Sequence, residues 1–331
     1  MLKIDLENHF YDESLIEILK KRKRPPFMTQ DEQIIQWTDA IAMPQGDLLG
    51  QLRECAEKRK KLLESKGITD AVISSSQGPE ELDLEESIQV CRQTNQHLYA
   101  ITQEFPEFYH GSATLPIGDI ETAREELIKC VKEYGFVSWH TNSNYGKTAP
   151  DDKMYWPLFR EAESLGIYVY LHPNIPKFAR TEGFGFTLAG PGLGFTLDTM
   201  LTITKMIVSG LFDEMPDLKV VLGHLGEALP FLLDRMENRL AFLPNKDIHI
   251  KHELKYYFQK NIYVTTSGNM SAEAFDCAKR VLGMDRICFG SDYPFERLDG
   301  ILDFLDDVQL SEKEREQLFY KNAIDELGIR K

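Results

Sequence analysis

The most constraining feature of this sequence is an alternation between short, apolar β-type runs and longer segments with helical periodicity. Several of the runs are continuous in Val, Ile, Leu and Tyr, which is typical of strands buried on both faces of a parallel sheet. Eight strands are expected, at Lys3–Leu6, Ala71–Ser74, Tyr109–Thr114, Gly135–Trp139, Ile167–Leu171, Lys219–Leu222, Asn261–Thr265 and Arg286–Phe289. This order predicts an α/β fold, either a closed barrel or a doubly wound sheet.

The segments between these runs repeat apolar residues at helical spacing. Helices are expected at Asp83–Gln103, Asp119–Tyr134, Asp152–Leu165, Thr196–Phe212, Glu227–Phe242, Ala272–Leu282 and Glu312–Leu327. Eight strand units without the Gly-x-Gly-x-x-Gly turn of a dinucleotide-binding sheet favour a (β/α)8 TIM barrel. No linker or internal repeat divides the 331 residues, so residues 1–331 are predicted to form a single barrel domain with loop insertions.

Charge and composition argue against several classes of partner. The formal net charge of -15 and the pI near 5.1 oppose binding to a phosphate backbone, which relies on Lys and Arg. The one basic run, Lys20 to Arg24, is interpreted as a solvated helix end. The sequence has neither a signal-peptide pattern nor an apolar run of about 20 residues. We therefore expect a cytoplasmic protein that binds neither nucleic acid nor membrane.

The cysteines indicate neither a disulfide framework nor a zinc site. They form an odd set without Cys-x-x-Cys spacing. All five are expected to be buried thiols, namely Cys55, Cys91, Cys130, Cys277 and Cys288.

Two long segments interrupt the alternation, Tyr11–Pro44 after the first strand and Asn174–Phe195 after the fifth. Both are expected to be irregular and to leave the barrel at the end where active sites lie, so that they form the walls and lid of a pocket. The second contains the glycine-rich Leu188–Phe195. This stretch lacks the Lys-Ser/Thr of a phosphate-binding loop and is interpreted as a structural turn.

Glu7 and His9 are the first candidate metal ligands. They lie two residues apart at the end of the first predicted strand, so their side chains project to the same side. Both can therefore reach one ion. Taken alone, Glu-x-His is a weak signal, and Glu7 can equally be a solvated strand end.

Two further candidate ligands end apolar strands and are followed by proline or Tyr-Pro, His172 after the fifth strand and Asp292 after the eighth. Each has a structural alternative, since His172 can hydrogen-bond within a core and Asp292 can cap a turn. The C-terminal edge of barrel strands carries catalysis, which favours the functional interpretation. With Glu7 and His9 they make two imidazoles and two carboxylates, a set that suits Zn, Mn or Fe and leaves positions open for substrate or water.

The stretch Val220–Pro230 runs from a buried strand through two glycines into a helix. It places His224 at the strand end and Glu227 near the helix start. Glu227 can cap that helix and can also accept an N–H from His224, which would fix the tautomer of the imidazole. Arg235 lies about two helical turns further on, where a guanidinium can bind a substrate carboxylate in bidentate fashion.

These fragments together resemble the amidohydrolase superfamily, and within it the branch of nonhydrolytic, metal-dependent decarboxylases that includes aminocarboxymuconate semialdehyde decarboxylase. Within this branch the chain resembles the γ-resorcylate and 2,3-dihydroxybenzoate decarboxylases. The resemblance covers nearly the whole chain and rests on the order and spacing of Leu171-His-Pro, Ala189-Gly-Pro, Ser209-Gly-Leu-Phe-Asp-Glu, Leu222-Gly-His-Leu-Gly-Glu-Ala-Leu-Pro, Thr265-Thr-Ser-Gly-Asn and Ser291-Asp-Tyr-Pro-Phe-Glu.

The opening motif refines this resemblance. Most amidohydrolases begin with His-x-His, whereas this chain has Glu7-Asn-His9, as the resorcylate-type decarboxylases do. The fourth predicted strand also lacks the lysine that bridges two metals in binuclear hydrolases. The resemblance therefore implies a decarboxylase with one divalent metal ion, Zn²⁺ or Mn²⁺, with Mg²⁺ as a further possibility.

Carried over position by position, the resemblance implies a role for eight residues. The metal ligands fall on Glu7, His9, His172 and Asp292. The catalytic or substrate-contacting His and Glu fall on His224 and Glu227, and the substrate-binding residues on Arg235 and Asn142. Family members are commonly dimers or tetramers, which implies a homodimer or homotetramer.

Two positions depart from the family pattern. His140 has no recognised counterpart, and packing and pocket lining are about equally compatible with it. After Ala189-Gly-Pro191 the relatives often carry a bulky aromatic residue, whereas this chain reads Gly192-Leu193-Gly194. If that loop walls the pocket, the pocket is wider or differently shaped than one that binds γ-resorcylate.

The resulting hypothesis is nonoxidative decarboxylation of an ortho-hydroxybenzoate-type aromatic acid. The ring is protonated at the carbon that bears the carboxylate, with Asp292 as the acid and with Arg235 and His224 holding the substrate. A hydrolase or hydratase that activates a metal-bound water is the first alternative. A noncatalytic barrel that binds a metal or an aromatic ligand is the second.

Overall fold

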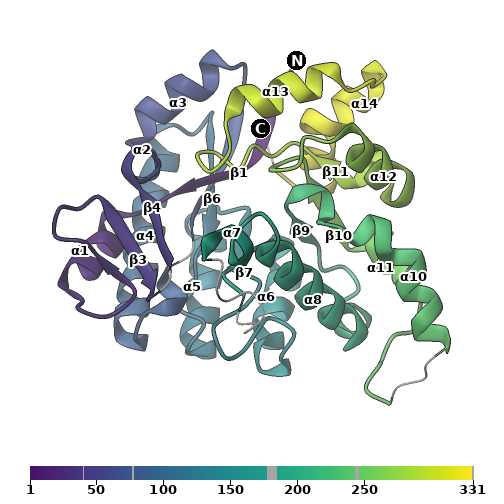
Figure 1. The fold of residues 1–331 in the computed structure, drawn as a ribbon, viewed down its shortest axis with the longest axis horizontal. Coiled ribbons are helices and arrows are strands. Elements are labelled where there is room, and N and C mark those ends of the chain that lie inside the picture. Colours follow the sequence, from purple (N-terminus) through teal and green to yellow (C-terminus); the bar gives the residue numbers. More distant parts are fainter. Residues whose placement is uncertain (40, 77, 177–184, 243–245, 330–331) are drawn as a thin grey trace.

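Eight parallel strands form the centre of the molecule and confirm the predicted (β/α)8 barrel (Figure 1). The computed structural model describes residues 1–331 except 40, 77, 177–184, 243–245 and 330–331. Within the described residues, the order of neighbouring strands is β1 (Ile4–Phe10), β5 (Asp70–Ser75), β6 (Tyr109–Ala113), β7 (Ser138–Asn142), β8 (Tyr168–His172), β9 (Val220–Leu222), β10 (Ile262–Thr265) and β11 (Ile287–Cys288).

Backbone hydrogen bonds join the first strand to the segment that follows the last one. Leu6 N donates to Phe289 O at 3.1 Å, and His9 N donates to Tyr293 O at 2.8 Å. Asn8 also forms an isolated parallel bridge with Tyr293. The N-terminal strand therefore lies against the chain after β11, which brings opposite ends of the sequence together.

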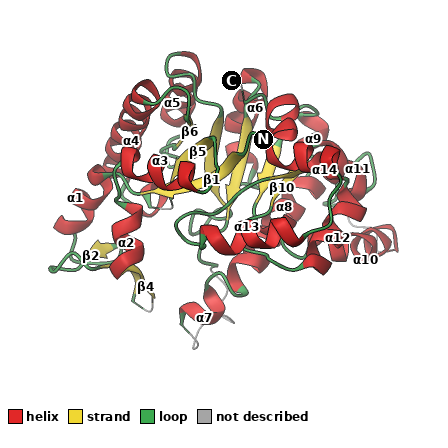
Figure 2. Cartoon of the chain, turned by 90° about the horizontal axis from the view of Figure 1, so that it is seen from above, coloured by secondary structure: helices red, strands yellow, loops and turns green. Residues whose placement is uncertain are grey.

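Helices surround the strands, as the view from above shows (Figure 2). Their bounds are α1 (Glu13–Lys21), α2 (Gly46–Leu52), α3 (Ala56–Ser65), α4 (Leu84–Glu104), α5 (Ile120–Lys132), α6 (Trp156–Leu165), α7 (Phe186–Ala189), α8 (Gly194–Val208), α9 (Leu211–Glu214), α10 (Leu229–Phe242), α11 (Leu254–Lys260), α12 (Ala272–Leu282), α13 (Leu298–Asp307) and α14 (Glu312–Glu316), with a π-helical segment at Gln317–Glu326. None of the helices in the described ranges is long and apolar enough to cross a membrane.

Alternate residues of the strands face two different cores, as period-two geometry requires. Trp139 on β7 and Val169 on β8 pack in the large core that also contains side chains of the surrounding helices. Tyr168 and Tyr170 face the other way, into a smaller core with residues of β1, β9 and β10. This alternation assigns an inner and an outer face to each strand.

All eight predicted strands are present, and one of them is displaced. Gly135–Trp139 was expected, whereas β7 is Ser138–Asn142. Gly135 has a φ of +73°, a conformation outside the β region, so the strand cannot begin there. The displacement matters because it places His140 and Asn142 inside the strand.

The helical predictions are confirmed for the strongly periodic segments, with α4, α5 and α12 close to their expected bounds. The expected helix Thr196–Phe212 is divided into α8 and α9 because Gly210 adopts a left-handed φ of +85°. Six helices in the described part of the chain were missed, namely α1, α2, α3, α7, α11 and α13. In α3, only Arg59 and Leu63 are buried, so it shows little apolar periodicity.

The segment Tyr11–Pro44 is not irregular, and that expectation is wrong. It contains α1 and the antiparallel strands β2 (Phe27–Met28), β3 (Ile34–Thr38) and β4 (Ile41–Gln45). The prediction that basic residues mark a helix end is confirmed, since Lys20 and Lys21 occupy the last turn of α1. The other predicted segment, Asn174–Phe195, lies partly outside the described residues.

The prediction that all five cysteines are buried is also wrong. Cys91, Cys130 and Cys288 are buried, but Cys55 is exposed and Cys277 is partly exposed. Cys55 precedes α3, whose outer face is polar, and so it lies at the surface.

The glycine-rich Leu188–Phe195 forms a turn between α7 and α8, as predicted. A Cβ atom on Gly194 would lie 2.3 Å from the carbonyl oxygen of Ala189, closer than any van der Waals contact. A glycine is required because the backbone approaches itself too closely for a side chain.

This contact predicts opposite effects for two glycine substitutions. Gly194→Ala should destabilise the protein by about 1–3 kcal/mol, the range for forced overpacking. Gly50→Ala in α2 is the matched control, because a Cβ there meets no atom within 4 Å and alanine favours a helix by about 0.5–1 kcal/mol. Denaturation midpoints would measure both changes, and equal midpoints for the two variants would contradict the close approach.

Candidate metal centre

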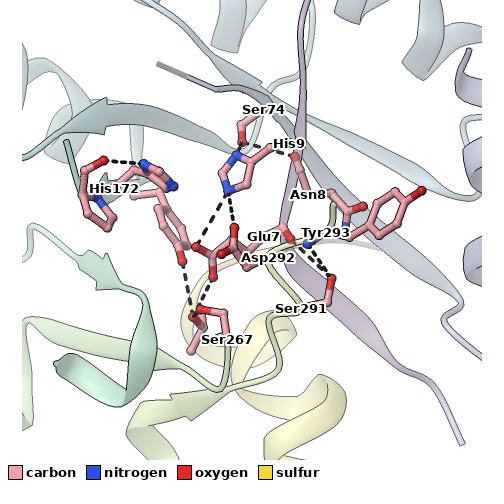
Figure 3. A network of polar contacts seen from close by, with 12 residues as sticks. Glu7, Asn8, His9, Ser74, His172, Ser267, Ser291, Asp292 and Tyr293 are labelled. Carbon is pink, nitrogen blue, oxygen red and sulfur yellow. Dashed lines mark hydrogen bonds and ion pairs between the residues drawn. The ribbon is translucent and has the colours of Figure 1, made fainter. Parts of the chain in front are cut away.

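The four predicted metal ligands converge at the C-terminal ends of the barrel strands. Glu7 and His9 belong to β1, His172 is the last residue of β8, and Asp292 follows β11. One donor atom of each lies within 4.8 Å of a donor atom of every other member, and all four side chains are buried. Residues separated by 285 positions thus form one cluster (Figure 3).

Three buried donor atoms of this cluster make no hydrogen bond with any described residue, namely Glu7 Oε1, His9 Nε2 and Asp292 Oδ1. His9 Nε2 lies 3.2 Å from Asp292 Oδ1 and 3.8 Å from Glu7 Oε1. Buried polar atoms normally have partners, because an unsatisfied one costs free energy. A divalent cation between these carboxylates and imidazoles satisfies all three atoms, so the residues fit such an ion.

Neighbouring groups orient the donors of the cluster. His9 Nδ1 lies 3.2 Å from Ser74 Oγ, and His172 Nδ1 lies 2.7 Å from the carbonyl oxygen of Pro173. A carbonyl can only accept, so His172 Nδ1 carries the proton and its Nε2 remains available as a ligand. Such outer partners typically fix the tautomer and ring orientation of metal-binding histidines.

Burial and mutual proximity shift the pKa of the two carboxyl groups in opposite directions. Burial raises the pKa of Asp292, and the charge of Glu7 raises it further. Burial also acts to raise the pKa of Glu7, but the contact with His9 and the charges of the nearby imidazoles outweigh it and lower that pKa. Burial acts to lower the pKa of His9, whereas its contacts with Asp292 and Glu7 raise it to about 9. Because the two buried carboxylates repel each other when both are charged, a cation bound between them would be stabilised.

His224 and Glu227 form a pair beside the cluster. His224 Nδ1 lies 2.8 Å from Glu227 Oε1, and Thr196 Oγ1 donates to Glu227 Oε2 at 2.7 Å. The predicted contact between the two residues is thus present. Burial acts to lower the pKa of His224, but the charge of Glu227 and this hydrogen bond outweigh it and raise the pKa to about 10. The Nε2 atom of His224 faces Asp292 Oδ2 at 4.0 Å.

Backbone strain concentrates in the same place. His224, Leu225, Glu227 and Asp292 all have φ between +55° and +60°, a region that costs non-glycine residues free energy. A Cβ on Gly268 would lie 2.5 Å from His224 Cδ2, so the glycine allows the neighbouring loop to press against the imidazole. Strained backbone of this kind is typical of functional sites, where the surrounding fold holds it.

A cavity opens directly onto the cluster. His172, His224 and Asp292 line it, and most of the other lining residues are apolar. They are Trp37, Met43, Pro44, Leu48, Pro173, Ile175, Phe186, Pro191, Phe195, Phe295 and Glu296. A concave, largely apolar pocket with a few convergent polar groups is the usual form of a small-molecule site.

Four other residues from the sequence predictions do not line the pocket. Arg235 is exposed on α10, and Asn142 donates a hydrogen bond to Glu80 in a neighbouring small cavity, so neither lines the apolar pocket. Gly192 and Leu193 are exposed, whereas the adjacent Pro191 lines the pocket. The substrate-binding roles of Arg235 and Asn142 therefore stay predictions.

The sequence analysis missed the residues that hold the cluster in place. Asp5 is fully buried and accepts hydrogen bonds from Ser291 N at 2.8 Å and Ser291 Oγ at 2.5 Å. Thr265 Oγ1 donates to Glu7 Oε2 at 3.0 Å. The available signal was the presence of small hydroxyl residues at strand ends, Ser74–Ser76 and Thr265–Ser267.

Comparison with known proteins decides the family. The model of the amidohydrolase family described as "Amidohydrolase" matches residues 4–329. The chain belongs to this family. It is 32% identical over 288 residues to a γ-resorcylate decarboxylase of Polaromonas sp., which covers 84% of this chain and 88% of the relative. The resemblance inferred from the motifs is thereby confirmed.

Solved structures agree with this relationship. A 2,6-dihydroxybenzoate decarboxylase from Rhizobium superposes with a TM-score of 0.84 at 30% identity and covers 98% of both chains. A dihydroxybenzoic acid decarboxylase from Polaromonas sp. superposes with a TM-score of 0.83 at 30% identity, covering 98% of this chain and 96% of that one. The Polaromonas structure contains bound manganese and the inhibitor 2-nitroresorcinol.

The His224–Glu227 pair generates a prediction for the metal-free protein. Glu227→Gln removes a negative charge 2.8 Å from the imidazole, so the pKa of His224 should fall and its protonated form should be lost at lower pH. NMR titration of the histidine side chains would measure the change. The control Glu296→Gln alters a carboxyl group of the same pocket that interacts with His224 by charge but forms no hydrogen bond with it in the described structure, and it should shift that pKa less. An unchanged pKa in Glu227→Gln would contradict the assigned interaction.

Proposed function

We propose that this protein is a metal-dependent decarboxylase of an ortho-hydroxybenzoate-type aromatic acid, such as a γ-resorcylate-like or other dihydroxybenzoate. The observation that carries the proposal is the convergence of Glu7, His9, His172 and Asp292 in one buried cluster, of which His172 and Asp292 line an apolar pocket. The decarboxylases among its relatives support the choice of reaction.

One divalent ion would be held by the four-residue cluster, with the donor atoms that lack hydrogen bonds as its ligands. Bound there, the ion would supply Lewis acidity and a template for the oxygen atoms of the substrate. The manganese in the Polaromonas relative supports Mn²⁺, and the imidazoles also suit Zn²⁺. Mg²⁺ prefers oxygen ligands, so only the two carboxylates of the cluster suit it.

The pocket would hold the aromatic ring against the cluster. Phe295, Trp37 and Phe195 line the pocket and would provide apolar surface for the ring. His224 would donate a hydrogen bond from Nε2 to an oxygen of the substrate, since Glu227 engages its Nδ1. Arg235, exposed in this protomer, would contribute only if the substrate or a neighbouring subunit reaches it.

Asp292 is the proposed acid. Its proton moves to the ring carbon that bears the carboxylate, which interrupts the aromatic system. The carbon–carbon bond to the carboxylate then breaks, its electron pair returns to the ring, and CO2 leaves. The ring carbon keeps the proton, and Asp292 regains one from solvent. Apolar walls strengthen the electrostatic contribution of each polar group during these steps.

Exposed apolar side chains support a homo-oligomer. Leu193, Leu197 and Leu201 are spaced four residues apart at the start of α8 and are 39–47% exposed. Phe231 and Phe242 on α10 are 80% and 71% exposed. Apolar stripes of this kind favour burial against a partner surface, so we infer a homodimer or homotetramer. A cytoplasmic location stays a prediction.

The acid can be tested by an isosteric substitution. Asp292→Asn should lower the rate of CO2 release by about 10²–10⁴-fold, the usual contribution of a general acid. The control Glu296→Gln changes another acid of the same pocket and should retain far more activity. Metal content must be measured for both variants. An Asp292→Asn protein that carries metal and remains active would exclude Asp292 as the acid.

The reaction class can be tested with metal removal and a substrate panel. Chelation should abolish CO2 release from hydroxybenzoates, and re-addition of Mn²⁺ or Zn²⁺ should restore it, because the cluster would then be refilled. The panel comprises dihydroxybenzoates, carboxyvanillate and isoorotate, with lactones as substrates for hydrolysis. Acid release from lactones without CO2 release would favour the hydrolase alternative. Metal binding without turnover of any compound would favour a noncatalytic barrel.

A further inference from the structure

His140 lies on the inner face of β7, next to the His9 and His172 side chains of the proposed metal cluster. In the register between β7 and β8, His140 pairs with Tyr170, and Asn142 pairs with His172. The neighbouring Trp139 faces the outer core, so strand alternation directs His140 into the barrel. Along the strands, His140 therefore lies two residues before the level of His172, which is the last residue of β8.

The imidazole of His140 approaches two of the proposed ligands. Its ring centroid lies 5.3 Å from that of His9 and 5.1 Å from that of His172. One ring nitrogen from each of the three residues lies within 4.8 Å of one from each of the others. Two nitrogens on one Zn²⁺ ion are at most about 4.2 Å apart, twice the usual bond length, so only a small side-chain adjustment is required.

No described residue satisfies the Nε2 atom of His140. This atom is buried and makes no hydrogen bond within the described part of the chain, and the whole residue is only 6% exposed. The ring is stacked on Tyr170, with centroids 5.7 Å apart and an interplanar angle of 12°. The imidazole is thus held in place while a donor atom remains unpaired, which a purely packing role leaves unexplained.

Two donor sets therefore share His9 and His172. The first adds the carboxylates of Glu7 and Asp292, and the second adds the imidazole of His140. Carboxylate oxygen suits Mn²⁺, whereas imidazole nitrogen suits Zn²⁺. We propose that His140 is a further metal ligand of this centre, which joins His9 and His172 on a bound Zn²⁺ ion and raises the preference of the site for Zn²⁺ over Mn²⁺. The inference rests on the metal centre of the proposed function.

Metal affinity provides a test that does not depend on turnover. Full-length protein is stripped with a chelator, and its affinities for Zn²⁺ and for Mn²⁺ are measured by competition with a chromophoric chelator. His140→Leu should weaken Zn²⁺ binding by at least about tenfold, with a much smaller change for Mn²⁺. His140→Gln supplies an oxygen donor and should retain Mn²⁺ affinity while losing Zn²⁺ affinity.

His110→Leu is the matched control. His110 belongs to β6 and is outside both donor sets, and its buried Nε2 atom makes no hydrogen bond to a described residue, although it lies 3.5 Å from Asp70 Oδ1. It should leave both affinities unchanged. Equal Zn²⁺ affinities in wild type and a folded His140→Leu variant would overturn the inference, as would an equal loss for both metals.

A second measurement needs no variant. In wild-type protein loaded with Co²⁺ as a substitute for Zn²⁺, proton NMR should show three strongly shifted, exchangeable imidazole N–H signals, from His9, His140 and His172. Two signals would exclude His140, even if His140→Leu does not fold. Failure of the proposed function is distinguishable from failure of this inference. It would appear in the wild-type protein, either as the absence of Zn²⁺ and Mn²⁺ binding or as the absence of CO2 release from every acid tested.

Discussion

The buried contact between Asp5 and Ser291 links the first strand of the barrel to the segment that follows the last strand, and the rest of the site depends on it. Asp5 lies on β1, and Ser291 immediately precedes Asp292. The carboxylate of Asp5 accepts hydrogen bonds from the backbone N–H and the hydroxyl of Ser291 and from the backbone N–H of Glu7. Since burial raises the pKa of Asp5 to about 7, these hydrogen bonds only partly offset the cost of burying its charge. The same contact sets the position of Asp292 relative to Glu7 and His9.

The contact between β1 and the segment after β11 also helps to hold the strained backbone around the pocket. The positive φ of Asp292 and those of His224 and Glu227 are conformations that a flexible loop would avoid. They persist because the strands on either side are paired and the adjoining loops approach closely, as Gly268 does at His224. The functional side chains are thereby held in fixed relative positions, which is the condition for precise placement of a substrate.

Strong apolar patterns in the sequence were sufficient to predict the barrel, because buried parallel strands are continuous in Val, Ile and Tyr. Weak patterns failed for physical reasons. The polar helix α3 buries only two side chains, and the three-stranded sheet β2–β4 was read as irregular because its strands are short and separated by turns. The shift of β7 came from Gly135, whose left-handed φ is not visible in the residue type alone. These errors concern the pocket wall more than the barrel itself.

The sequence by itself determined the chemical identity of the candidate ligands and their order along eight strands. Glu7 in place of the usual histidine and Asp292 before Tyr-Pro are local features, so they could be recognised without coordinates. The sequence assigned the segment Tyr11–Pro44 to the pocket wall, but only the tertiary structure decided that Trp37 of this segment lines the pocket, that Arg235 does not, and that His140 lies close to His9 and His172. The reason is that strand register and barrel closure set which side chains meet, and both depend on contacts between residues far apart in the chain.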